Sequence, residues 1–104
     1  MTTETGAEKP RTRYGRENTG HATMTTDKLT VATAVLAEVA RTESIHPHWP
    51  VDFVHGAAIV AEEAGELVRA ALNSHYHHAD PDEMRTEAIH TAATAIRFLC
   101  NYSE

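Results

Sequence analysis

Two interruptions constrain this chain most, because they divide its apolar part into three segments. Residues 46–50 read His-Pro-His-Trp-Pro, and two prolines this close force an extended connection. Residues 80–83 read Asp-Pro-Asp-Glu, a typical helix start with Asp80 as N-cap, Pro81 at the first helical position and Glu83 three residues after the cap. No segment alternates apolar and polar residues as a strand does. The sequence therefore predicts three helices.

The first helix is expected over residues 26–42. Thr25 or Thr26 is placed to cap its start. Its apolar residues recur at intervals of four and predict a one-sided stripe made of Val31, Val35, Val39 and the adjacent Leu36. Residues 1–25 hold almost no large apolar residue, so we expect them to form a flexible N-terminal tail before a helical domain over residues 26–104.

The second helix is expected to begin near Val51 or Asp52 and to end near Asn73. It is apolar around much of its circumference, which favours a central place in a bundle. The third helix is expected from Pro81 to Leu99 or Cys100, with a seam of mostly small residues on one side: Ala88, Ala92, Ala95 and Leu99. Residues 74–79 are interpreted as a loop, short enough to make these two helices antiparallel neighbours.

The predicted fold class is all-α, a helical bundle of three main helices per chain that is completed by oligomerisation. The chain has 104 residues, close to the size at which a single core becomes marginal, so a dimer or tetramer is expected. Alanine is abundant and favours helices over strands.

Charge and apolar content exclude several classes of function. The net charge of -6 argues against a stable nucleic-acid partner. No apolar run approaches the roughly 20 residues that span a bilayer, so no membrane association is expected. Cys100 is the single cysteine and allows no intrachain disulfide, which favours a cytoplasmic location.

The second helix carries Glu62, Glu63 and Glu66 in one narrow sector, because residues three and four apart lie about 60° and 40° apart around a helix. Like charges at these spacings repel. Arg69 or a hard divalent metal ion would compensate them, and a solvated acidic face is the plain alternative. The third helix offers Glu87 and His90, three residues apart. Measured from the loop, Glu66 and Glu87 lie at comparable depths, so the two helices are expected to share a metal site.

These residues resemble the signature of the MazG-like nucleoside triphosphate pyrophosphohydrolases. The signature is two glutamates three apart, a spacer, then a glutamate and an aspartate three apart. Here Glu63-Ala-Gly-Glu66 is followed, after twenty residues, by Glu87-Ala-Ile-His90. Residues 55–67 and 87–99 resemble two consecutive helices of small, often phage-borne members, and the likeness covers roughly residues 45–100.

The resemblance implies an oligomeric bundle that hydrolyses a nucleoside triphosphate to the monophosphate and pyrophosphate. It implies Mg²⁺, with Mn²⁺ as an option, held by Glu63, Glu66 and Glu87. Glu62 would support these catalytic glutamates, and one carboxylate would help deprotonate the attacking water. A phage-encoded member would act in the host cytoplasm.

His90 stands where the family has aspartate. Magnesium has little use for an imidazole ligand. At the metal site His90 therefore has three interpretations: it orients a carboxylate, it shifts the preference toward Mn²⁺, or it marks a weakened or lost activity. The last interpretation leads to a non-catalytic nucleotide- or metal-binding relative that acts as an interaction module.

Three further residues are candidates for substrate binding. Trp49 is placed to stack on a base, or to anchor the first two helices against each other. His55 either touches phosphate or completes a core hydrogen bond, and Arg97 continues the stripe of Glu87 and His90. A competing hypothesis is a transition-metal site on the clustered histidines: His46, His48, His75, His77 and His78.

Overall fold

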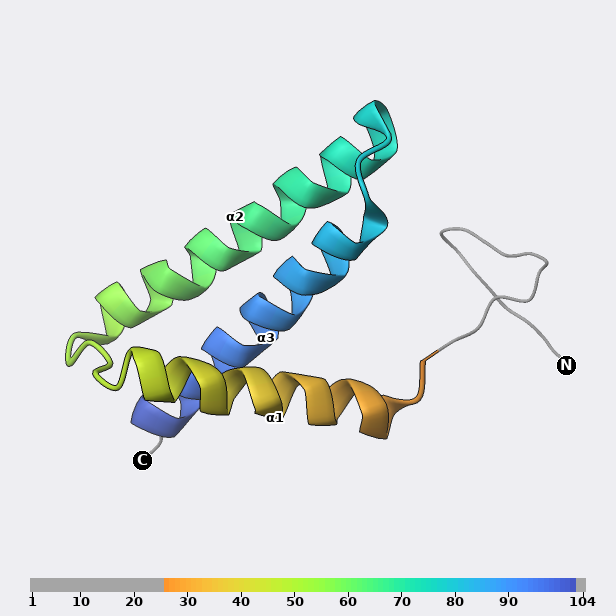
Figure 1. Cartoon of the computed structure of the whole chain (residues 1–104). Coiled ribbons are helices and arrows are strands. Elements are labelled where there is room, and N and C mark those ends of the chain that lie inside the picture. The colour runs from red at the N-terminus through yellow and green to blue at the C-terminus, as the bar shows by residue number, and fades with distance from the viewer. Residues whose placement is uncertain (1–25, 103–104) are drawn as a thin grey trace, which may run out of the picture.

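The computed structural model describes residues 26–102, which form three helices: α1 (Lys28–Ile45), α2 (Phe53–His77) and α3 (Pro81–Tyr102) (Figure 1). Within this range there is no strand, which confirms the all-α fold class; completion by oligomerisation stays a prediction. The expected N-terminal tail, residues 1–25, lies outside the described residues, as do residues 103–104. Among the described helices, none is long and apolar enough to cross a bilayer.

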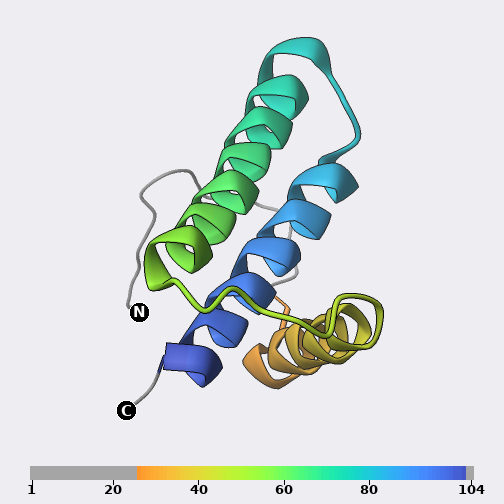
Figure 2. The same ribbon diagram turned by 90° about the vertical axis from the view of Figure 1, so that its left-hand side faces the viewer.

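The central helix is α3. On one flank, α2 packs antiparallel along the length of α3. On the other flank, α1 crosses α3 without approaching the α2 backbone (Figures 1 and 2). The expectation that the second helix is central was therefore wrong. The extended connection, residues 46–52, carries the chain from one flank of α3 to the other, so α2 packs on one side only.

Local hydrogen bonds set the helix starts. At the start of α1 Asp27 occupies the N-cap position and its side chain makes no capping bond, so the prediction of Thr25 or Thr26 as cap was wrong. At the start of α2 the Asp52 carboxylate accepts from the Val54 N–H at 2.9 Å. At the start of α3 the Asp80 carboxylate accepts from the Asp82 N–H at 3.0 Å, as the sequence predicts.

All three helices run further than predicted. The His46 N–H still donates to the Thr42 carbonyl at 2.7 Å, which extends α1 to Ile45. The largest difference is in α2, which continues to His77, so the predicted loop over residues 74–79 begins four residues too early. His78 ends this helix in the left-handed conformation (φ 59°, ψ 30°), and the Ala79 N–H bonds back to the Asn73 carbonyl.

The core is small and lies where α1 crosses α3. Val35 and Val39 bury their side chains against Ala93, with Ile89, Ala92 and Ile96 packed around them. The predicted stripe was wrong for Leu36, whose side chain is 58% exposed, and for Val31, which is also exposed. The predicted seam on α3 is half-buried at Ala92 and Ala95 but exposed at Ala88 and Leu99. Because α1 crosses α3 at an angle, it buries only the turn at the crossing point, which explains the exposure of Val31 and Leu36.

The connection between α1 and α2 is held by the last turns of α3. Arg97 donates to the His46 carbonyl at 2.7 Å, and its guanidinium lies 5.1 Å from the centre of the Trp49 ring. Tyr102 donates to the carbonyls of Pro50 and Asp52. Trp49 thus packs against α3, and its ring also lies close to α2 at Gly56.

Candidate metal centre

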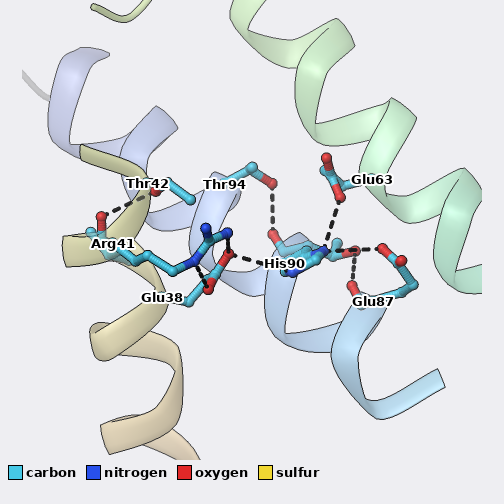
Figure 3. Close-up of polar contacts among 9 residues, drawn as sticks. Glu38, Arg41, Thr42, Glu63, Glu87, His90 and Thr94 are labelled. Atoms are coloured by element: carbon cyan, nitrogen blue, oxygen red, sulfur yellow. Dashed lines mark hydrogen bonds and ion pairs between the residues drawn. The ribbon is translucent and has the colours of Figure 1, made fainter. Parts of the chain in front are cut away.

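The candidate site gathers side chains from all three helices around the His90 imidazole (Figure 3). His90 Nδ1 lies 3.2 Å from Glu87 Oε1 and 3.8 Å from Glu63 Oε1. On the other edge of the ring, Nε2 lies 3.4 Å from Glu38 Oε2. A protonated imidazole therefore pairs with three carboxylates at once.

Helix periodicity and the hairpin place these residues together. Glu87 and His90 are three residues apart on α3 and therefore share one face. The antiparallel α2 presents Glu63 to that face, and the crossing of α1 adds Glu38 from the opposite side. The second and third helices thus bring Glu63, Glu87 and His90 together, and their binding of a metal ion stays a prediction.

Three of these side chains fit a single divalent cation. Glu63, Glu87 and His90 each offer one ligand atom, and the three atoms lie within 4.8 Å of one another. Ligands on one Mg²⁺ lie at most about 4.2 Å apart, so small side-chain rotations would close the set. The two carboxylates suit Mg²⁺ or Mn²⁺, and the imidazole moves the preference away from Mg²⁺. The donor chemistry therefore fits the predicted ion, with Mn²⁺ better matched than Mg²⁺.

Burial and neighbouring carboxylates act together on Glu63, the most crowded acidic group of the site. Burial is the main reason that the pKa of Glu63 lies above its ordinary value. The His90 imidazole opposes this shift, while the carboxylates of Glu87, Glu66 and Glu62 add to it. A carboxyl with a raised pKa among other carboxylates is typical of a functional site, because a bound cation would relieve the repulsion.

Sequence reasoning missed Glu38 and Arg41, which complete the site on the α1 side. Arg41 donates to both Glu38 oxygens, at 2.9 Å and 2.7 Å. These hydrogen bonds hold the pKa of Glu38 below its ordinary value, against the opposing effect of burial. The signal was the position of Glu38 directly before the buried Val39, which places its side chain at the edge of the α3 contact.

Two predicted glutamates lie outside this group. The Glu66 carboxylate lies 3.9 Å from Arg69 and lines a separate open cleft of about 280 Å³ together with Glu87. Glu62 is exposed on α2. Their expected parts in metal binding and catalysis stay predictions.

A second cleft, of about 190 Å³, opens between α1 and the α2–α3 hairpin. Glu63 and His90 line it together with Arg41 and His46. Neither cleft is lined by the predicted substrate-binding residues Trp49, His55 and Arg97. His55 is exposed on α2 and Arg97 is only 6% exposed, held against the connection. Their role in substrate binding remains a prediction.

The clustered histidines do not form a comparable group in the part of the chain that is described. His75 and His77 belong to the last turn of α2, and the His75 ring lies edge-on to Tyr76 at 4.4 Å. Over residues 26–102, no group of three histidine, cysteine or acidic side chains other than Glu63, Glu87 and His90 comes close enough to share an ion.

Comparison with known proteins finds no match: no family model, no curated protein and no solved structure is similar to this chain at significance. The MazG-like resemblance therefore rests on the residues of α2 and α3 themselves.

Proposed function

We propose that this protein hydrolyses a nucleoside triphosphate to the monophosphate and pyrophosphate, with Mg²⁺ or Mn²⁺ at Glu63, Glu87 and His90. One observation carries the proposal. Two antiparallel helices bring these three ligand atoms within 4.8 Å of one another, at the residue spacing of the MazG-like signature. A cytoplasmic location and a homo-oligomeric state belong to the same proposal.

Different residues of the chain have different roles in the proposed hydrolysis. A bound divalent cation supplies charge for the phosphate oxygens and lowers the pKa of water. Glu63, Glu87 and His90 would hold that cation. Without an ion, His90 Nδ1 lies near both carboxylates and keeps them in place. Glu66 lines the neighbouring cleft, where its half-exposed carboxylate lies 3.9 Å from Arg69, so the deprotonation of the attacking water falls to a carboxylate of the ion-holding group.

The triphosphate fits best in the cleft between α1 and the hairpin. Phosphate needs cationic partners, and this cleft has His46 and Arg41, which is paired with Glu38, at its walls as well as the ligand residues. The cleft that Glu66 lines has one arginine, Arg69, among several acidic side chains: Asp80, Asp82, Glu83 and Glu87. Repulsion by these carboxylates disfavours it as the entry for triphosphate.

A second candidate function is the binding of metal or nucleotide without catalysis, as a non-catalytic relative of the family would do. The observation in its favour is that His90, in the position of the family's aspartate, contacts three carboxylates. When protonated, this imidazole compensates their charge without a metal ion.

A screen of the common ribo- and deoxyribonucleoside triphosphates with Mg²⁺ and with Mn²⁺, read as released pyrophosphate, separates the two. We expect equal amounts of monophosphate and pyrophosphate from the wild type, and a loss of about a hundredfold in Glu63→Gln and Glu87→Gln. Glu43→Gln, an exposed change on α1, is the matched control and should keep full activity. No release with any triphosphate, alongside a rise in melting temperature with metal, favours the second candidate.

A further inference from the structure

The face of α2 that points away from α3 is an unbroken apolar stripe. Residues recur on it at alternating intervals of four and three: Val54, Ala58, Ala61, Gly65, Val68 and Leu72. All six are exposed, and the large ones strongly so: Val54 is 65% exposed, Val68 57% and Leu72 50%. Because α2 packs only on α3, nothing in the described chain covers this stripe.

The spacing of the stripe matches helix-to-helix packing. Apolar residues at an average interval of 3.5 keep one seam facing a neighbouring helix over a long distance. The stripe runs for about 27 Å along α2. Single exposed apolar residues are ordinary on a protein surface, but a continuous stripe of this length marks an interaction surface.

Gly65, at the middle of the stripe, indicates that a partner helix approaches the α2 backbone closely at this position. A Cβ added at this glycine would meet no atom within 4 Å, so the chain's own packing does not require it. Glycine weakens a helix interior relative to alanine. A small residue at the centre of an exposed seam permits the close approach of a second helix backbone.

Charges beside the stripe identify the partner. Glu62 and Arg69 lie along one edge, on either side of the midpoint, whereas the other edge is formed by Ala57, Ala64 and Ala71. We propose that α2 pairs antiparallel with α2 of a second copy of this chain. A twofold axis near Gly65 then brings Glu62 opposite Arg69 of the partner subunit, and Arg69 opposite the partner's Glu62. Parallel pairing would set the charged edge against alanine and form no ion pair.

An apolar cleft continues the same surface. It has a volume of about 380 Å³ and is lined by Ala57 and Val60 of α2 and by Ala95, Phe98 and Leu99 of α3. It adjoins the alanine edge of the stripe at Ala57, so the apolar surface beside a partner helix extends from α2 onto α3. The pairing assigns a specific interface to the homo-oligomeric state of the proposed function, and it does not depend on the proposed hydrolysis.

Sedimentation equilibrium of the full chain at micromolar concentration tests the pairing. The wild type should be dimeric, or a tetramer of such dimers. Gly65→Leu should shift it toward the monomer while its helical circular dichroism is kept, because the added side chain meets open space within one chain. Ala40→Leu, the same kind of change on the exposed face of α1, is the control and should leave the dimer intact.

A charge swap tests the antiparallel arrangement. Glu62→Arg and Arg69→Glu should each raise the dimer Kd by about tenfold, because each turns two attractive pairs into like charges. The double variant restores attraction and should recover the Kd to within about threefold of the wild type. Glu43→Arg and Arg85→Glu change the net charge equally at exposed positions and should have no effect. A monomeric wild type, a dimer that survives Gly65→Leu, or a double variant without recovery overturns the proposal.

Discussion

His90 Nε2 lies 3.4 Å from Glu38 Oε2, which joins α1 to a site that otherwise belongs to the α2–α3 hairpin. The same ring reaches Glu63 and Glu87 through Nδ1. The imidazole thus connects all three helices. A change in its contacts with these carboxylates should therefore affect both folding and metal binding.

Replacing His90 with aspartate should destabilise the metal-free protein by about 1–2 kcal/mol, because a fourth carboxylate joins three others. Saturating Mg²⁺ should then raise the melting temperature more in His90→Asp than in the wild type, since the ion now relieves stronger repulsion. Thermal unfolding with and without Mg²⁺ measures both effects. His90→Ala is the control, because it removes the ring without adding charge; equal metal responses of the two variants would count against the site.

Glu63→Gln should stabilise the metal-free fold at neutral pH. The pKa of Glu63 is raised in the folded state, so ionising this group costs the fold stability as the pH rises from the unfolded pKa through the folded one. Below the unfolded pKa both states are protonated, and the advantage of glutamine should disappear.

Urea unfolding at pH 7 and at pH 3 measures this difference for Glu63→Gln, with Glu43→Gln as the exposed control. The same variant should lose most of the stabilisation that Mg²⁺ or Mn²⁺ gives the wild type. A metal response that survives the substitution would place the ion elsewhere.

Arg97→Ala should cost about 2–4 kcal/mol of stability, because it removes a buried guanidinium that holds the His46 carbonyl and covers Trp49. Tyr102→Phe removes hydroxyl bonds to Pro50 and Asp52 and should cost about 1 kcal/mol. Chemical denaturation gives both values. If Arg97 instead serves the substrate, its replacement should raise KM and leave the free energy of unfolding nearly unchanged.

The two glycines of α2 should respond in opposite directions to alanine. A Cβ at Gly56 would lie 2.8 Å from Tyr102 Oη, so Gly56→Ala should destabilise the fold by about 1–3 kcal/mol through overpacking. Gly65→Ala meets open space and should stabilise the isolated chain by about 0.5–1 kcal/mol. Thermal unfolding at low protein concentration compares them, and a loss of stability in both variants would contradict the open space at Gly65.

Sequence reasoning found the helices and one half of the site because both depend on local spacing. Capping at Asp80 fixed the start of α3, and residues three apart placed Glu87 beside His90. The central position of α3 and the exposure of Leu36 depend on the path of residues 46–52, which no local pattern shows. Glu38 reaches His90 only through the crossing of α1, a contact between residues far apart in the chain.

The hydrogen bonds from Arg97 and Tyr102 to residues 46–52 also imply an order in which the three helices assemble. The hairpin of α2 and α3 closes a short turn, whereas these two residues bond to partners 50 to 52 positions away, so their contacts form later at a greater entropic cost. We therefore expect α1 to dock last and to separate first. Early in unfolding, Glu38 should leave His90 while Glu63 and Glu87 stay together, so hydrogen exchange should begin in α1 with the rest of the site still assembled.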